Sequence, residues 1–164
     1  MSAGAEARAE PGVTLQEITA ATVRAVIDLS VHDSQANFVA PNAVSLAEAL
    51  FKKEAWYRAI VADGQLAGFV MLFDEAQREA PPMQPRIALW RLMIDQSFQR
   101  RGIGTEALRR VVAHVRAKGL YHSLQVSYYP GEGCPEPFYR RFGFQHTGRL
   151  DAGEVIMELP LDRP

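Results

Sequence analysis

The chain has 164 residues, of which 48% are hydrophobic and 23% are charged, and its formal net charge at pH 7 is −1. This length predicts one domain with a buried core. A net charge near zero provides no long-range field that would recruit nucleic acid or an anionic membrane, so we expect neither as a partner. The single cysteine, Cys134, excludes an internal disulfide and a zinc site built from several cysteines.

Residues 1–11 are rich in Ala, Glu and Gly and lack an apolar core, which predicts a flexible tail and not a targeting segment. Residues 12–164 are expected to form the single domain. No apolar run approaches the roughly 18 to 20 residues that a membrane-spanning helix needs. Together with the low cysteine content, this favours a cytoplasmic location.

The first third of the chain predicts one strand followed by two short helices. Residues Val13 to Ile18 alternate apolar and polar side chains, as a half-buried strand does. Thr19 can cap a first helix. The inward positions of that helix are expected to be Val23, Val26, Ile27 and Leu29. After a polar connection over 32–41, the run Ser45 to Glu48 matches a capping box and predicts the start of a second helix, with Leu46, Ala49 and Leu50 inward.

The middle of the chain predicts a hairpin and then a central strand. The β-rich runs Tyr57–Ala62 and Leu66–Phe73 flank Asp63-Gly64, a pair suited to a tight turn. The polar segment Asp74–Pro85 holds three prolines and predicts an exposed loop. The run Arg86–Ile94 is apolar on both faces, which is typical of a central strand.

An amphipathic helix is expected over Thr105–Lys118, ended by Gly119. Its inward stripe is Leu108, Val111, Val112 and Val115. Glu106 and Arg110 are placed to pair on the outer face, and His114 is expected to be solvated on the polar side.

The remaining residues predict a strand over Ser123–Tyr129, a short helix over Glu136–Phe142, and strands over Phe144–Thr147 and Val155–Leu159. The whole pattern is that of a mixed sheet flanked by helices. The four histidines do not have the spacing of metal ligands, so no metal site is expected. They are His32, His114, His122 and His146.

A glycine-containing turn, Gln99-Arg100-Arg101-Gly102-Ile103-Gly104, separates the central strand from the amphipathic helix. Glycines let a ligand approach the backbone, and the unpaired N–H groups of a helix start attract anions. A helix start with two solvated arginines would look the same. The dinucleotide pattern G-x-G-x-x-A also fits, but its first glycine should follow the strand directly and an acid should follow about 20 residues later. Neither condition is met, and the phosphate-loop pattern is absent.

A family resemblance favours a third interpretation of this turn. Gln99-x-x-Gly102-x-Gly104 matches the Q/R-x-x-G-x-G/A motif of the GNAT superfamily of N-acetyltransferases, and the downstream run Phe138–Phe144 resembles that superfamily's Y-x-x-x-G-F segment. The two blocks occur in the superfamily's order and spacing. Three further segments resemble the bacterial spermine/spermidine acetyltransferase-like branch: Gln35-x-x-Phe38-Val39-x-x-Asn42-x-x-Ser45-Leu46, Gly68–Met71 and Trp90–Asp95.

The resemblance implies a GNAT fold of the α+β class, a three-layer arrangement with a central, mixed, mostly antiparallel twisted sheet. Six to seven strands, about four flanking helices and splayed central strands are expected. Acetyl-CoA is the implied co-substrate. The backbone of Leu92, Met93 and Ile94 is expected to hold the pantetheine and the acetyl carbonyl. The pyrophosphate is expected to lie against Gln99, Arg100, Arg101, Gly102, Ile103, Gly104 and Thr105. Tyr139 is the implied acid for the leaving thiolate, with a structural tyrosine as the alternative.

Two positions depart from the superfamily's pattern. Trp90 occupies the central-strand position where many members carry an acidic general base, so Trp90 is expected to be either a core residue or a wall of the substrate channel. Glu132 stands where the superfamily often has an asparagine that contacts CoA. The base is therefore unassigned, with Glu132, Glu154 or ordered water as candidates. Cys134 could be a nucleophile, but no histidine is placed locally to activate it.

The resulting expectation is an acetyl-CoA-dependent N-acetyltransferase that moves the acetyl group directly to a primary amine, with a polyamine such as spermidine as the leading acceptor. Acids that could attract a polycation are Asp33, Glu48, Glu54, Asp74, Glu75 and Glu79. The alternatives are another small amine, an antibiotic or a protein amine as acceptor, an acyl-CoA-binding sensor without efficient catalysis, and a dinucleotide-binding module. A homodimer is a further expectation from the resemblance, because self-association is common in the superfamily.

Overall fold

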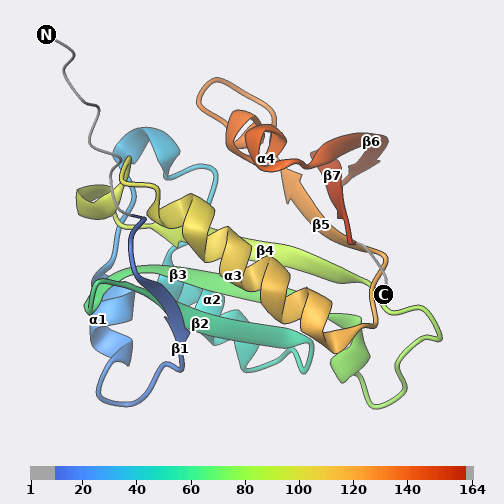
Figure 1. Ribbon diagram of the computed structural model, residues 1–164, viewed down its shortest axis with the longest axis horizontal. Helices are drawn as coiled ribbons and strands as arrows, with labels where there is room; N and C mark the ends of the chain where they lie inside the picture. The colour runs from blue at the N-terminus through green and yellow to red at the C-terminus, as the bar shows by residue number, and fades with distance from the viewer. Residues whose placement is uncertain (1–9, 162–164) are drawn as a thin grey trace, which may run out of the picture.

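One seven-stranded sheet runs through residues 10–161, the part of the chain that the computed structural model describes. Its strand order is β1-β2-β3-β4-β5-β7-β6 (Figure 1). Every neighbouring pair is antiparallel except β4 and β5. The strands are β1 (Val13–Gln16), β2 (Ala55–Ala62), β3 (Gln65–Asp74), β4 (Ile87–Ile94), β5 (Ser123–Tyr128), β6 (Gln145–Asp151) and β7 (Glu154–Pro160).

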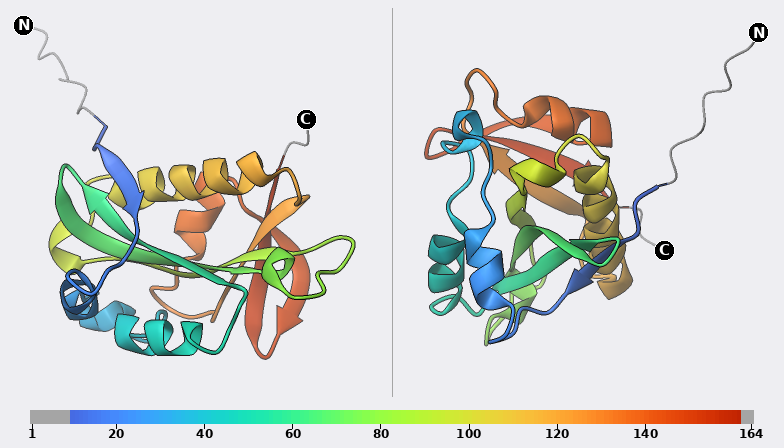
Figure 2. Two further views of the ribbon diagram at one scale, coloured as in Figure 1. Left: turned by 90° about the horizontal axis from the view of Figure 1, so that it is seen from below. Right: turned by 90° about the vertical axis from the view of Figure 1, so that its left-hand side faces the viewer.

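Four α-helices cover the two faces of the sheet: α1 (Val23–Asp28), α2 (Asn42–Ala49), α3 (Ile103–Lys118) and α4 (Glu136–Phe142). Figure 2 shows α3 and α4 on one face and α1 and α2 on the other. The predicted mixed, mostly antiparallel sheet with about four helices is confirmed. The predicted tail lies largely outside the described residues. No helix within 10–161 combines the length and the apolar character that crossing a bilayer requires.

The alternation of side chains along the strands builds two cores. In β3, Val70 and Leu72 face α3 and join the larger core. Phe69 and Met71, one residue earlier in each case, face the other way and join the smaller core under α1 and α2. The apolar stripe predicted for α3 is buried as expected, with Leu108 and Val111 fully enclosed. The sheet is therefore packed on both faces, which explains why β3 and β4 are apolar almost throughout.

The strands β4 and β5 separate after a short common stretch. They pair only from Ile87 to Leu89 of β4, opposite Leu124 to Val126 of β5. The rest of β4 keeps its pairing with β3, so one edge of β4 is left open. A β-bulge at Trp90 accompanies the change, because Leu89 pairs with Leu72 and Arg91 with Met71. The splayed central strands are thus present, and they open the sheet in the middle of the molecule.

Gly68 is placed where β3 must approach β4 closely. It pairs with Ile94, and a Cβ added to it would lie 2.4 Å from the carbonyl oxygen of Met93. We expect Gly68→Ala to lower the free energy of unfolding by about 2 kcal/mol in urea denaturation, because backbone has to move to admit the methyl group. Gly104→Ala is the control, since its Cβ would find ordinary contacts at 3.6 and 3.7 Å. Equal stability of the two variants would contradict this account.

The second helix differs from the prediction. It begins at Asn42 after Pro41, and not at a Ser45 cap. The proline fixes the chain at the helix entry, and its carbonyl accepts the N–H of Ser45, which is buried inside the helix. Leu50 follows the last turn and is 80% exposed, so its predicted inward position is wrong. Ile27 of α1 is also 41% exposed, because α1 ends one residue later.

The second half of the chain corrects three smaller predictions. The helix α3 starts at Ile103, two residues earlier than predicted, because Gly102 takes the cap position. The predicted solvation of His114 is wrong. Its ring stacks on Trp56 of β2 at 4.3 Å, and this burial lowers the pKa of His114. The predicted strand over Phe144–Thr147 is longer, because β6 continues to Asp151 in a hairpin with β7.

Candidate active site

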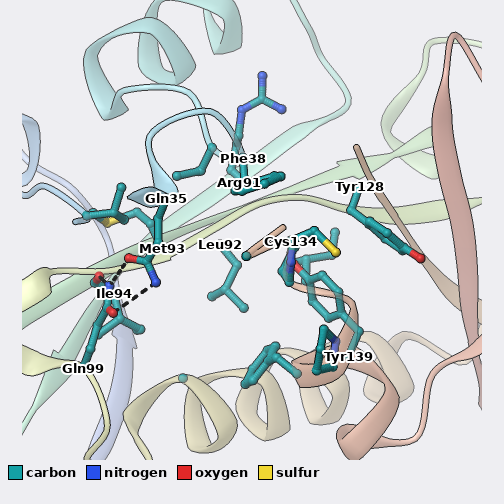
Figure 3. Close-up of a pocket in the computed structure, with 18 of the residues that line it drawn as sticks. Gln35, Phe38, Arg91, Leu92, Met93, Ile94, Gln99, Tyr128, Cys134 and Tyr139 are labelled. Carbon is teal, nitrogen blue, oxygen red and sulfur yellow. Dashed lines mark hydrogen bonds between the residues drawn. The ribbon is translucent and has the colours of Figure 1, made fainter. Parts of the chain in front are cut away.

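A cavity of about 960 Å³ occupies the place where β4 and β5 separate. Its walls come from five parts of the chain: the segment before α2, the second half of β4, the turn into α3, the stretch from the end of β5 into α4, and the first residue of β7. Figure 3 shows Gln35 and Gln99 at one end of this cavity and Tyr128 and Tyr139 at the other. A volume of this size is at the upper end for small-molecule sites. The splay therefore creates a ligand site inside the sheet.

The open edge of β4 presents backbone groups to the cavity. The N–H of Asp95 donates to the carbonyl of Ala67 on β3, and successive residues of a strand direct their N–H and C=O to opposite edges. Leu92 and Ile94 therefore direct theirs toward the gap, whereas Met93 directs its groups toward β3. The carbonyl of Ile94 already accepts the Gln99 side chain at 3.0 Å. Leu92 and the Ile94 N–H are thus the groups of this edge that a ligand can use.

The glycine turn forms the end of the cavity at the start of α3. Gly102 caps the helix in the left-handed conformation, with φ of 78°, where a side chain would be strained. Gly104 faces Ile94 and Phe138, so a Cβ there would take up space within the cavity. The first N–H groups of α3, a helix of 16 residues, lack partners in the helix and suit an anion.

The two arginines of the turn are placed differently. Arg100 has a positive φ of 61° and lines the cavity together with Gly102, Ile103, Gly104 and Thr105. Arg101 lies outside the lining. Its guanidinium donates to the carbonyl of Ser97 at 2.9 Å and lies over the ring of Phe98. Of the predicted phosphate-binding residues, the structure therefore brings all but Arg101 to the cavity.

Gln99 is committed to an interaction that the sequence did not reveal. Its amide exchanges two hydrogen bonds with the amide of Gln35, at 2.8 and 3.2 Å (Figure 3). This pair attaches the segment before α2 to the glycine turn. Farther along that segment, Phe38 lies beside the loop of Gly131 and Gly133, where an added Cβ would be 3.9 Å from its ring. The segment thus lines the cavity from the glycine turn of α3 to the loop before α4.

Tyr139 lies in α4 with its side chain almost fully buried. Its ring meets Phe138 and Phe144 edge-on, with centroids 5.4 and 5.5 Å apart. Burial raises the pKa of the phenol above its ordinary value, so the hydroxyl stays protonated at neutral pH. No hydrogen bond joins this hydroxyl to any other described residue, although it belongs to a cavity-lining side chain. It is therefore a free donor.

The bulge in β4 turns two successive side chains to the face of α1 and α2. Trp90 packs on the smaller core, and Arg91 donates to Glu48 of α2 at 3.2 Å. The Nε of Arg91 is buried without a partner within residues 10–161. Both side chains line the cavity. Trp90 is therefore at once a packing residue and a cavity wall, the two interpretations that the sequence left open.

The opposite wall contains Glu154, one of the candidate bases, and two residues to which the sequence assigned no role. Ser127 and Tyr128 end β5, and Glu154 begins β7. Ser127 donates to the Glu154 carboxylate at 2.7 Å. A hairpin signal around Ala152-Gly153 could have placed Glu154 beside β5, but which face it occupies depends on the register. Glu132, the other acid considered, is exposed and does not line the cavity.

The charges on the cavity walls are unequal. Three arginines line it, against one glutamate: Arg91, Arg100 and Arg141 against Glu154. Such a site suits a ligand with several negative charges near the glycine turn. Within the described part of the chain, no group of three or more His, Cys, Asp and Glu residues could hold a metal ion.

Comparison with known proteins assigns the family. The sequence profile of the acetyltransferase (GNAT) family matches residues 24–144, so the chain belongs to this family and is an N-acetyltransferase. It is 29% identical over 151 residues to the spermine/spermidine N(1)-acetyltransferase of Bacillus subtilis strain 168, covering 88% of this chain and 96% of that protein. The Bacillus protein also matches the branch to which the resemblance pointed.

Solved structures share the fold. The PaiA N-acetyltransferase of Thermoplasma acidophilum in complex with coenzyme A has a TM-score of 0.64 at 14% identity, over 90% of this chain and 98% of that one. A GNAT family acetyltransferase of Elizabethkingia anophelis with acetyl-CoA bound has a TM-score of 0.61 at 14% identity, over 91% and 98% of the two chains. The GNAT fold expected from the resemblance is confirmed.

Proposed function

We propose that this chain transfers the acetyl group of acetyl-CoA directly to a primary amine, and that polyamines are its leading class of acceptor. The observation that carries the proposal is the single cavity that joins the glycine turn of α3, the open edge of β4 and the free hydroxyl of Tyr139. Acetyl-CoA needs N–H donors for its pyrophosphate, a free strand edge for the amides of its pantetheine, and a hydrogen-bond donor beside its sulfur. The cavity supplies the three in this order.

In this proposal the turn from Gln99 to Thr105 binds the pyrophosphate through backbone N–H groups, assisted by Arg100. Gln99 contributes by fixing the turn, since its side chain is paired with Gln35. Arg101 acts only through the local positive charge, because its guanidinium is engaged by Ser97. The 16-residue helix behind the turn adds its dipole.

The open edge of β4 is proposed to hold the pantetheine and the acetyl carbonyl. Leu92 and Ile94 offer backbone groups at the gap, and Met93 between them fixes the strand to β3. A preorganised N–H beside the carbonyl oxygen stabilises the negative charge that develops there during attack. The reacting carbon then lies where β4 and β5 part, accessible from the face of α1 and α2.

Tyr139 is proposed to stabilise the leaving thiolate. A thiol has a pKa of about 8.5, so the thiolate leaves more readily when it receives a hydrogen bond. The phenol is the weaker acid, and burial weakens it further. Tyr139 therefore donates a hydrogen bond as charge develops on sulfur, and transfers its proton only as another proton replaces it.

A polyamine acceptor is supported by the printed name of the Bacillus relative, not by a set of free acids. Four of the six acids considered from sequence are engaged elsewhere. Asp74 is paired with Lys118, Glu75 with Arg86, Glu54 with Arg78 and Glu79 with Lys53. Glu48 is paired with Arg91, and Asp33 is exposed. The cavity itself contributes Glu154, which is enough to hold one ammonium group at the reacting end.

The decisive experiment measures CoA release from acetyl-CoA with a panel of amines: spermidine, spermine, simple alkylamines, an aminoglycoside and a peptide N-terminus. We expect acceptor-dependent release with spermidine or spermine as the best substrates. A better alkylamine, aminoglycoside or peptide would keep the reaction and replace the acceptor class. Binding of acetyl-CoA without release for any amine would instead favour an acyl-CoA sensor, the candidate to which Trp90 at the usual position of the base points.

A further inference from the structure

The central strand carries no group that can take a proton from the acceptor. Trp90 stands where the superfamily often has an acid, and an indole N–H only donates. Its ring meets Phe73 edge-on at 5.7 Å and lies under the guanidinium of Arg91 at 5.1 Å. Arg91 is itself a cation. Because an alkylamine is protonated at neutral pH, with a pKa near about 10.4, the proton acceptor has to come from another wall.

Glu154 is the acid that the cavity offers. Among the lining residues it is the one carboxylate in residues 10–161. It lies on β7, the strand next to β5 in the sheet. β4 lines one side of the gap, and β5 and β7 lie on the other side, so Glu154 is opposite β4. The neighbouring lining residues Tyr128 and Tyr129 belong to the same side. The hairpin side therefore presents a carboxylate to the same cavity that the open edge of β4 lines.

The β6–β7 hairpin holds the carboxylate in position. Residue 154 follows a turn in which Ala152 and Gly153 both have positive φ, and the side chain is half-buried. Its Oε2 accepts a hydrogen bond from Ser127 Oγ at 2.7 Å. Its Oε1 has no hydrogen bond or ion pair with another described residue. One oxygen is therefore fixed by the protein, and the other is available to a ligand.

We infer that Glu154 binds the acceptor's ammonium group and removes its proton, with Ser127 as the residue that positions the carboxylate. This inference rests on the proposed transfer to a primary amine and supplies the base that β4 lacks. Removal of the ammonium proton is thereby placed at the β6–β7 hairpin side of the cavity. The subsite around Glu154 is expected to recognise a primary ammonium group.

The ammonium nitrogen gives one proton to Glu154 Oε1, and its freed electron pair forms the bond to the acetyl carbon while the C=O π pair moves onto oxygen. This pair then re-forms the C=O bond, the C–S bond breaks, and the C–S electron pair goes to sulfur. The nitrogen loses its second proton to solvent water. Tyr139 gives its proton to sulfur and regains one from solvent. The proton on Glu154 passes to solvent, so that each turnover yields an amide, a thiol and one released proton.

The test compares Glu154→Gln with Glu17→Gln, an identical change at an exposed acid outside the cavity. With spermidine or propylamine we expect Glu154→Gln to lower kcat/KM by about 100-fold, the lower part of the range for a catalytic base. With trifluoroethylamine, which is largely neutral at pH 7, we expect a loss below about fivefold, because no proton has to be removed before attack. With propylamine, the loss for Ser127→Ala should be smaller than that for Glu154→Gln, and Glu17→Gln should match the wild type.

Three results would overturn the inference. An unchanged Glu154→Gln enzyme, or equal losses for propylamine and trifluoroethylamine, would remove Glu154 as the base while leaving the acetyl transfer intact. If the wild type acetylates no amine, the proposed function fails. Calorimetric titration of spermidine into the CoA-saturated protein then tests the subsite separately, and binding that Glu154→Gln does not weaken would reject it. Thermal melting of each variant verifies that the protein is folded.

Discussion

Replacing Tyr139 by phenylalanine is expected to reduce kcat about 1000-fold, within the range for a catalytic acid, while the KM for acetyl-CoA changes little. The edge-on contacts to Phe138 and Phe144 involve the ring, so Phe keeps them. The substitution removes only the hydroxyl, which contacts no other polar group in the described residues. A loss confined to kcat therefore reports an interaction made in the transition state. The measurement is steady-state CoA release at saturating acceptor.

Tyr57→Phe is the matched control, because this half-buried tyrosine packs near Phe69 and lies outside the cavity. The pH profile provides a second test. Burial raises the pKa of Tyr139, so its proton is retained beyond the ordinary value of about 10, and no decline of kcat below that pH should come from this group. Unchanged kcat in Tyr139→Phe, with both substrates saturating, would remove the hydroxyl from the mechanism.

Much of the fold was predictable because its signals are local. The four-residue stripe of α3 and the Asp63-Gly64 turn depend on periodicity and backbone preference within a few residues. The start of α2 was not predictable in this way. A capping-box match at Ser45 competed with the entry at Pro41, and the choice was made by Asn42, which is buried and donates to the carbonyl of Val26. That contact joins two helices, so no local pattern contains it.

The residues of the candidate site also differ in whether a local pattern predicts them. The residues of the glycine turn and Tyr139 carry motifs, and the structure brings them to one cavity. Gln35 and Arg91 belong to segments that resemble the polyamine acetyltransferase-like branch, and Glu154 is one of the candidate bases, but no local pattern brings these three residues to the cavity that they line. Gln35 reaches it through a pair with Gln99, 64 residues away, and Glu154 through the register of β7 on β5. Such positions follow from tertiary pairing, which a single sequence does not encode in a readable pattern.

Replacing Asp74 by asparagine is expected to lower the free energy of unfolding at pH 7 by about 3 kcal/mol, the lower end for breaking a buried ion pair. Asp74 is fully buried at the end of β3. Its carboxylate accepts hydrogen bonds from Lys118 Nζ at 2.7 Å, Tyr121 Oη at 2.5 Å and the Ala76 N–H at 3.0 Å. These donors join the ends of β3 and α3 to the start of β5. Urea denaturation measures the change, and a melting point lower by about 6 to 12 °C should accompany it.

The pH dependence of this loss follows from the pKa of Asp74. Burial by itself would raise this pKa, but the hydrogen bonds from Lys118, Tyr121 and Ala76 outweigh it, so the pKa is lower in the folded protein than in the unfolded chain. The charged carboxylate therefore contributes its stability above the unfolded value of about 3.9, and this contribution disappears as the pH falls through the lower, folded value. The gap between wild type and Asp74→Asn should be full at pH 7 and should narrow below about pH 4.

The partner variant shows whether the ion pair or the carboxylate alone matters. Lys118→Met leaves Asp74 buried with neutral donors only, from Tyr121, Ala76 and Gln77. It should therefore also destabilise, and the double variant should lose less than the sum of the two. Asp28→Asn, an exposed acid without a partner in the described residues, is the control and should change little. Asp74 is remote from the cavity, so kcat per folded molecule should remain that of the wild type. Additive losses, or a gap that stays constant down to pH 3, would show that the Asp74 charge does not stabilise this junction.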